Sequence, residues 1–216
     1  MGIRCIAFFL CTSVAFCQPP AIVIGFVGGF VKHDNRVHSV VQVAAHLRAD
    51  YPGVHVEVFE NRHREKAHRR ILQLLAARRE GARVIIYGHS WGASETVTLA
   101  RELEKEGIPV RLTIQVDSVK KIGEEDSVIP ANVARAANYY QPRGLIRGRP
   151  EIRAADATRT SILGNFRFDY ASRSIVCDGY PRFSRVVMKP HIQIECDPNV
   201  WNQVEALIRS ELTAEY

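Results

Sequence analysis

The sequence predicts an α/β fold in which helices cover both faces of a mainly parallel sheet. Short apolar runs alternate with segments of helical periodicity from residue 21 to residue 116, and repeated strand–helix–strand units form right-handed crossovers in a parallel sheet. A serine flanked by glycines also stands directly between one apolar run and the next helical segment. With 216 residues, 46% of them hydrophobic, we expect a single domain over residues 18–216.

The first half of the chain has the clearest element signals. Apolar residues three or four positions apart predict a helix over 37–47, a second that contains residues 71–75 and stops near Gly81, and a third that starts after Ser90 and stops at Gly107. The strands are expected at Ala21–Ile24, Val54–Phe59, Arg83–Tyr87 and Pro109–Val116.

The second half has weaker signals. Segments 138–141 and 160–163 are each compatible with a strand, and 143–155 is interpreted as an irregular excursion rich in Gly and Arg. The apolar run Ser184–Met188 predicts a last strand. Asp197-Pro198 predicts the start of a terminal helix, because Asp is favoured as N-cap and Pro at the first helical position.

The first 17 residues have the layout of a signal peptide. Arg4 precedes an apolar run from Cys5 to Phe16 that is short for a membrane span. We expect cleavage before Gln18 and a secreted or periplasmic protein; the alternative is a membrane anchor formed by the uncleaved segment. Cleavage leaves Cys177 and Cys196, which we expect to form a disulfide in an oxidising compartment. Two buried free thiols are the alternative.

The net charge of +6 is modest, and much of the excess lies in residues 62–70. Such a basic segment could bind nucleic acid. However, no aromatic residues interleave the charges, as single-strand binders require. We therefore interpret the segment as the solvated start of a helix and predict no nucleic-acid partner.

The pattern Gly88-His-Ser90-Trp-Gly92 predicts a nucleophilic serine. It follows a buried strand and opens a helix. In that setting, two glycines permit a tight turn that presents the serine hydroxyl above the sheet. A glycine-rich turn with an idle serine is the alternative.

A serine nucleophile needs a base and a carboxylate that orients the base. His191 is the predicted base, because it follows Ser90 in the chain and is expected on a loop before the last helix; an ordinary exposed histidine is the alternative. Asp117 is the preferred acid, since it ends the strand after the nucleophile helix. Asp156 and Asp169 remain rival acids, and Asp117 could instead serve as a cap or turn residue.

An acyl-transfer intermediate also needs two backbone donors for its oxyanion. The amide of Trp91 is the first candidate, because it follows the nucleophile. The amide of Phe26, in the glycine-rich segment 25–29, is the second. That segment could also be a plain turn or a dinucleotide-type loop, although the full G-x-G-x-x-G pattern is missing.

Together, Gly25-Phe-Val-Gly-Gly29, Gly88-His-Ser-Trp-Gly92, Val116-Asp117 and His191 resemble the α/β-hydrolase superfamily, in particular small lipase- or esterase-like members. The resemblance covers most of the chain after residue 17. It implies Ser90 as nucleophile and His191 as base, and an acid after this earlier strand, as in some lipases. Two positions depart from lipase patterns. Ile24 stands where many lipases have His, and Ser118 where early-acid lipases have Pro.

The predicted function is therefore hydrolysis of a small-molecule or lipid carboxylic ester through an acyl-enzyme. A thioesterase or amidase could use the same residues, and an inactive binding protein on the same fold is the competing class. We predict no cofactor and no stable protein partner. We also predict no metal, because the spacing of His63 and His68 does not stack two ligands on one helical face.

Overall fold

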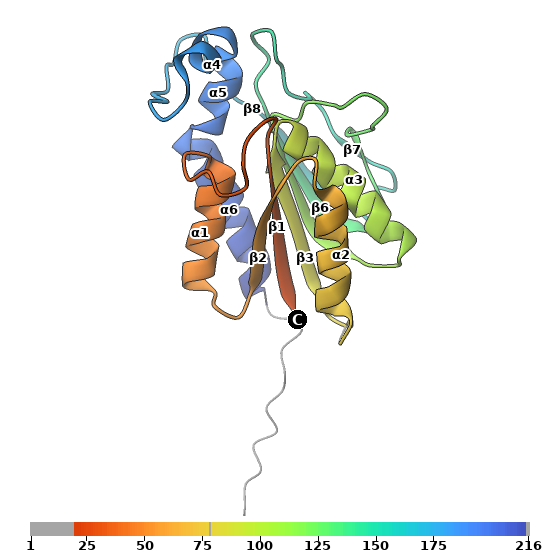
Figure 1. The fold of residues 1–216 in the computed structure, drawn as a ribbon. Helices are drawn as coiled ribbons and strands as arrows, with labels where there is room; N and C mark the ends of the chain where they lie inside the picture. Colours follow the sequence, from red (N-terminus) through yellow and green to blue (C-terminus); the bar gives the residue numbers. More distant parts are fainter. Residues whose placement is uncertain (1–19, 78, 215–216) are drawn as a thin grey trace, which may run out of the picture.

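The computed structural model describes residues 20–77 and 79–214 (Figure 1). The predicted signal segment, residues 1–17, lies outside the described residues. Among the helices within them, none is both long enough and apolar enough to cross a membrane.

A six-stranded parallel sheet forms the centre of the molecule, with strand order β2-β1-β3-β4-β6-β8. Its strands are β1 (Ala21–Val27), β2 (His55–Glu60), β3 (Arg83–His89), β4 (Val110–Val116), β6 (Val133–Tyr140) and β8 (Ser161–Arg167). A separate short pair joins β5 (Val128–Ile129) to β7 (Arg153–Ala154). The predicted fold class is confirmed.

Helices cover both faces of this sheet (Figure 1). α1 (Ser39–Asp50) and α6 (Pro198–Thr213) pack on one face, and α2 (Arg64–Leu75) and α3 (Trp91–Lys105) pack on the other. Two short helices, α4 (Arg182–Val187) and α5 (Lys189–Glu195), lie at the top of the view. The strands run upward in this view, so α4 and α5 lie beside the carboxyl ends of the strands.

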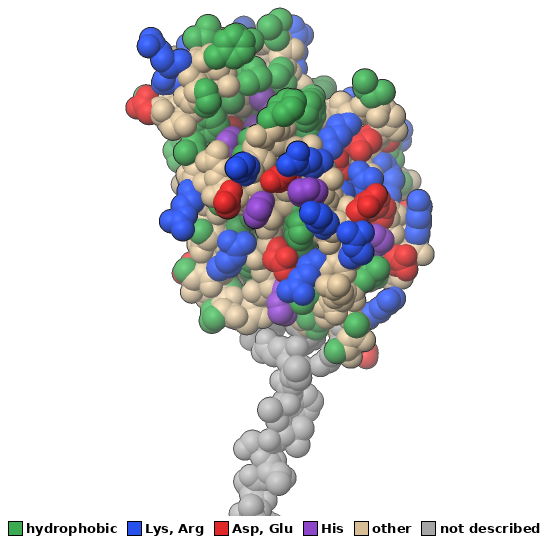
Figure 2. All heavy atoms as spheres, viewed as in Figure 1, with side chains coloured by type: hydrophobic (Ala, Val, Ile, Leu, Met, Phe, Trp, Pro, Cys, Tyr) green, Lys and Arg blue, Asp and Glu red, His purple; other side chains and the backbone are tan. Residues whose placement is uncertain are grey.

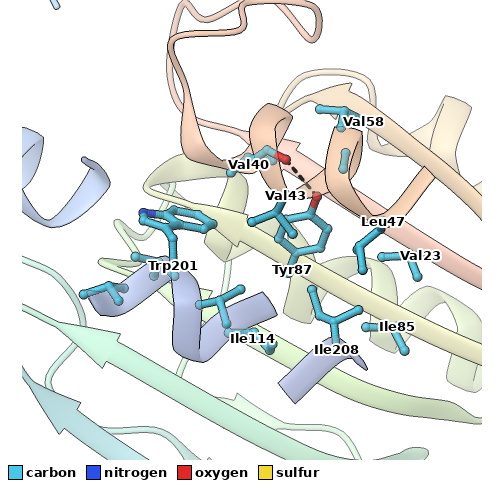
Figure 3. Close-up of a cluster of buried hydrophobic side chains, with 14 of the residues drawn as sticks. Val23, Val40, Val43, Leu47, Val58, Ile85, Tyr87, Ile114, Trp201 and Ile208 are labelled. Carbon is cyan, nitrogen blue, oxygen red and sulfur yellow. Dashed lines mark hydrogen bonds between the residues drawn. The ribbon is translucent and has the colours of Figure 1, made fainter. Parts of the chain in front are cut away.

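Alternation along the strands divides the core into two apolar layers. Ile85 and Tyr87 of β3 face α1 and α6, whereas Val84 and Ile86 face α2 and α3, as expected when a strand is buried on both sides. Figure 3 shows the first layer, in which the Tyr87 hydroxyl donates to the Val40 carbonyl oxygen at 2.8 Å. This bond satisfies the one polar atom of a fully buried ring.

The strand order reverses direction beside β1. The chain passes from β1 to β2 on one side and then returns to β3 on the other. In open α/β sheets, ligands bind outside the carboxyl ends of the strands at such a reversal. The loop after β1 and the turn after β3 therefore border the position where a site is expected.

Two element predictions are wrong. The segment predicted as a last strand, Ser184–Met188, lies mostly in helix α4, whose residues are not buried. Its valines suggest a strand, but the sheet already ends at β8. His191, expected on a loop, lies in helix α5. By contrast, segments 138–141 and 160–163 overlap β6 and β8, and the Asp197 side chain caps α6 as predicted.

Candidate active site

Ser90 occupies a strained turn between β3 and α3. Its backbone has φ 58° and ψ −126°, a conformation that L-residues rarely adopt. The flanking glycines make the turn possible: a Cβ on Gly88 would lie 2.5 Å from the Gly92 carbonyl oxygen, and a Cβ on Gly92 would lie 2.3 Å from the Phe26 carbonyl oxygen. Only glycine fits at these two positions, so the turn presents the Ser90 side chain at the carboxyl edge of the sheet.

Three predicted side chains meet at this edge. His191 Nε2 lies 2.9 Å from Ser90 Oγ, and His191 Nδ1 lies 2.6 Å from Asp117 Oδ2. When Nδ1 carries the proton and donates it to Asp117, Nε2 is free to accept the hydroxyl proton of Ser90. All three residues are buried. The arrangement is therefore a serine–imidazole–carboxylate chain with good hydrogen-bond distances.

Asp117 is held in place from several directions. Its backbone has φ 47°, and its side chain is fully buried. The backbone N–H and the side-chain amide of Gln141 each donate to this carboxylate at 3.0 Å. Gly148 packs so closely that a Cβ there would lie 2.0 Å from Asp117 Oδ1. The sequence alone gave no sign of Gln141 or Gly148, because their contacts depend on which strands pair.

The rival acids, Asp156 and Asp169, are engaged elsewhere. Asp169 Oδ1 accepts a hydrogen bond from Arg143 Nε at 2.6 Å, and this bond lowers the pKa of Asp169 to about 2. Asp156 accepts from the N–H and the hydroxyl of Thr158 within its own turn. Of the three carboxylates, Asp117 is the one that contacts His191.

The two predicted oxyanion donors differ in their positions. Trp91 is the first residue of α3, and backbone N–H groups in the first turn of a helix have no partner within the helix. Phe26 is not in a loop, as the sequence suggested, but lies inside β1 in register with Phe59 and Gly88. The strand continues to Val27 because Gly25 does not interrupt it.

The loop that reaches Ser90 begins at Gly28. A Cβ on Gly28 would lie 3.3 Å from Ser90 Cβ, and a Cβ on Gly29 would lie 2.7 Å from the ring of Trp91. The side-chain amide of Asn61 donates to the Gly28 carbonyl oxygen at 2.8 Å, which ties the loop to the end of β2. This segment therefore approaches the Ser90 side chain, whereas the Phe26 carbonyl packs against Gly92.

A hollow of about 350 Å³ lies next to the nucleophile turn. The rings of Phe30 and Trp91 stand on one side of it, with centroids 5.5 Å apart. Phe30 has φ 61° and is almost fully exposed. The remaining lining residues are Val31, Lys32, Glu60, Asn61 and Arg62. The hollow thus offers an aromatic surface at the residue that follows Ser90.

The structure joins Cys177 and Cys196 in a disulfide, as the sequence predicted. Cys196 directly follows α5, the helix that carries His191. In the segment that this disulfide closes, four large apolar side chains on or near α4 are exposed: Val176, Phe183, Val186 and Val187. Figure 2 shows hydrophobic side chains gathered on this upper lobe.

The basic residues of segment 62–70 are largely paired with acidic neighbours. Arg64 contacts Glu95, Glu102 and Glu124. Arg70 and Arg62 pair with Glu57 and Glu60, respectively. Figure 2 shows positive and negative side chains interleaved on this face, so it does not present a continuous positive surface. Within the described part of the chain, no group of three metal-ligating side chains is assembled.

No protein-family model matches the chain, and no curated protein matches it. Among solved structures, a cutinase-like protein from Cryptococcus sp. is similar with a TM-score of 0.53 and 14% identity, over 92% of this chain and 98% of that chain. Human thioesterase 2 (TM-score 0.48, 8% identity, 91% of this chain and 99% of that chain) and an acetylxylan esterase (TM-score 0.46, 9% identity, 90% and 99%) are also similar. Together with the parallel sheet, the similarity to the cutinase-like protein shows that the chain has the α/β-hydrolase fold.

Proposed function

We propose that the protein is a serine hydrolase that cleaves carboxylic esters through an acyl-enzyme. The observation that carries this proposal is the continuous hydrogen-bonded chain from Ser90 Oγ through His191 to Asp117, with distances of 2.9 and 2.6 Å. A buried serine on a strained turn with a bound imidazole has the geometry that nucleophilic catalysis requires. The fold, which several esterases and thioesterases share, is consistent with it.

In this mechanism His191 Nε2 takes the proton of Ser90 Oγ as the oxygen attacks the ester carbonyl carbon. The carbonyl π electrons move to its oxygen and form a tetrahedral oxyanion. Asp117 keeps the His191 ring oriented and stabilises the imidazolium that forms. His191 then gives its proton to the leaving alcohol as the ester C–O bond breaks, and the acyl group stays on Ser90.

Water completes the cycle. His191 takes a proton from a water molecule, whose oxygen attacks the acyl carbon, and the Ser90 oxygen leaves with that proton. The oxyanion formed in each half needs preorganised donors. We assign one to the Trp91 amide. The second belongs to the loop from Gly28 to Phe30, which approaches Ser90, in place of the predicted Phe26.

The substrate has an apolar portion in this proposal, since Phe30 and Trp91 line the hollow next to the turn that carries Ser90. The disulfide and the predicted signal sequence together favour secretion as the destination, because disulfides persist in oxidising compartments.

Turnover of p-nitrophenyl esters with acyl chains of increasing length tests this function. Ser90→Ala should lower kcat by roughly 1,000-fold or more. Ser94→Ala is the matched control, because Ser94 is also buried in the same helix but its hydroxyl donates to Glu124; it should retain near wild-type kcat. Activity should also survive exhaustive chelation.

Two outcomes would contradict the proposal. Equal turnover by wild type and Ser90→Ala would exclude Ser90 as the nucleophile. No turnover of any ester, thioester or activated amide by the wild-type protein would favour a binding protein on this fold. Turnover of thioesters alone would change the bond type and leave the mechanism in place.

A further inference from the structure

A second buried imidazole and carboxylate lie directly behind His191. The ring of His89 stacks on the ring of His191, with centroids 4.7 Å apart and an interplanar angle of 30°. His89 Nδ1 lies 3.2 Å from Glu195 Oε2. Both side chains are buried, with 4% of His89 and none of Glu195 exposed. The proton path from Ser90 to Asp117 uses neither of them.

Glu195 connects the helix of His191 to two other elements. It lies four residues after His191 in α5, so both side chains project from the same face of that helix. Its Oε1 accepts from the backbone N–H of Ser39, the first residue of α1, at 3.1 Å. His38 Nδ1 lies 3.2 Å from the same oxygen. Through His89 the carboxylate also reaches the end of β3, directly beside Ser90.

The charge state of Glu195 fits an anchoring role. Burial alone would raise the pKa of Glu195, but the imidazoles of His89 and His38 and the N–H of Ser39 together hold it below its ordinary value. A carboxylate is also favoured at the N-terminus of α1 by the helix dipole. Burial raises the pKa of the nearby Tyr180, and the negative charge of Glu195 raises it further.

His89 is kept neutral. Burial lowers its pKa to about 4, although the charge of Glu195 acts in the opposite direction. A neutral ring can remain stacked on His191 while His191 becomes an imidazolium, whereas a charged ring would repel it. The His89 Nε2 atom is buried without a hydrogen-bond partner in the described residues.

The helix that carries His191 is short and lies outside the sheet. α5 has seven residues, five of which are buried, whereas α4 before it buries none. Ile194 of α5 packs in the main apolar core. The apolar cluster beneath this segment contains three buried residues, Cys177, Tyr180 and Ile192. A misplacement of the base by about 1 Å can cost roughly 100-fold in rate. The polar contacts of Glu195 therefore act together with this apolar packing to fix the position of α5.

We propose that Glu195 and His89 are positioning residues for His191. Glu195 fixes the rotation and depth of α5 against the N-terminus of α1, and His89 supports one face of the His191 ring. The effect on catalysis rests on the proposed function, whereas the effect on the His191–Asp117 contact does not.

The test compares Glu195→Gln with Glu211→Gln. Both replace a buried carboxylate by the amide of the same shape, but Glu211 lies in α6 and pairs with Arg111 and Arg135. The readouts are kcat and KM for an ester, and the low-field proton NMR signal of the N–H between His191 and Asp117. Glu195→Gln should lower kcat roughly 10-fold or more with little change in KM, and should weaken the signal through faster exchange with water. Glu211→Gln should leave both unchanged.

A second variant guards against misfolding of Glu195→Gln. His89→Gln removes the stacked ring but leaves the contacts between Glu195 and α1, and it should also lower kcat and weaken the NMR signal. The proposal is overturned if folded variants at both positions keep the wild-type kcat and signal, even when they are less stable. If wild-type protein hydrolyses nothing, the proposed function fails. The NMR comparison then decides the positioning claim by itself.

Discussion

The proposed nucleophile and acid are held differently from the proposed base. Ser90 and Asp117 directly follow β3 and β4, two central strands whose backbones are fixed by neighbours on both sides. His191 lies in a short helix within residues 171–197, outside the sheet, where a disulfide and buried polar contacts add to the packing of Ile194 on the main core. The comparison shows that a large core fixes two members of the site, whereas the third depends on a few specific contacts.

The largest expected effect concerns the acid at the end of β4. Asp117→Asn should lower kcat by roughly 1,000-fold or more, because the amide no longer stabilises the imidazolium and favours the wrong tautomer of His191. Asp169→Asn is the control, since Asp169 is bound by Arg143 and Arg167, and should keep kcat within a factor of about two. Steady-state kinetics on an ester substrate measures both. A collapse of kcat in Asp169→Asn with activity retained in Asp117→Asn would assign the acid to the other carboxylate.

The disulfide should stabilise the segment of the base far more than the sheet. Cys177 and Cys196 are 19 residues apart, and a crosslink that closes a loop of this length contributes about 3 kcal/mol. Replacing both by Ser should therefore increase hydrogen exchange in residues 171–197 and lower kcat, while amides of β3 and α3 stay protected. Uniform loss of protection across sheet and segment would show that the two regions unfold as one unit.

A methyl group added at Gly148 should displace Asp117. Gly148→Ala places a Cβ 2.0 Å from Asp117 Oδ1 and 2.7 Å from Asp117 Cα. The backbone at residue 148 or the backbone at residue 117 must therefore move. We expect kcat to fall by roughly 100-fold. Gly53→Ala is the matched control, because a Cβ there meets no atom within 4 Å, and it should behave like wild type. Unchanged kcat in Gly148→Ala would mean that the acid tolerates displacement.

The smallest expected effect is a pH dependence of stability from His89. Burial lowers its pKa from 6.5 to about 4 in the folded protein, so the unfolded chain takes up this proton first as the pH falls. The contribution of the neutral ring is complete above about pH 6.5 and is lost toward pH 4, with about 2 kcal/mol lost between pH 7 and pH 5. Urea unfolding of wild type and His89→Gln at both values measures it. An equal loss of stability in both proteins would contradict the assignment.

The sequence predicted the sheet-borne part of the site more accurately than the rest. Buried strands give uninterrupted apolar runs, and a glycine on each side of Ser90 marks the turn, so β3, β4 and their terminal residues could be located. The predicted loop position of Phe26 is wrong because Gly25 suggests the end of the strand. In the structure Gly25 continues β1, and its missing Cβ leaves room for the Tyr87 ring.

The base region was predicted only in part. His191 could be chosen by its place in the chain order, but its helix could not, because Val186 and Val187 suggest a strand and are in fact exposed. Gln141 and Gly148 contact Asp117 only once β4 and β6 pair, with Val116 opposite Tyr139. Glu195 likewise depends on the docking of α5 against α1. These contacts join residues far apart in the chain, so periodicity and short motifs do not reveal them.

Labelling with a fluorophosphonate probe, followed by mass spectrometry of peptides, tests the central claim most directly. We expect wild-type protein to form one adduct per molecule, on the peptide that contains Ser90. Neither Ser90→Ala nor His191→Ala should form this adduct. A folded wild-type protein that hydrolyses esters but carries no adduct, or carries it on another residue, would contradict the claim that Ser90 is the nucleophile activated by His191.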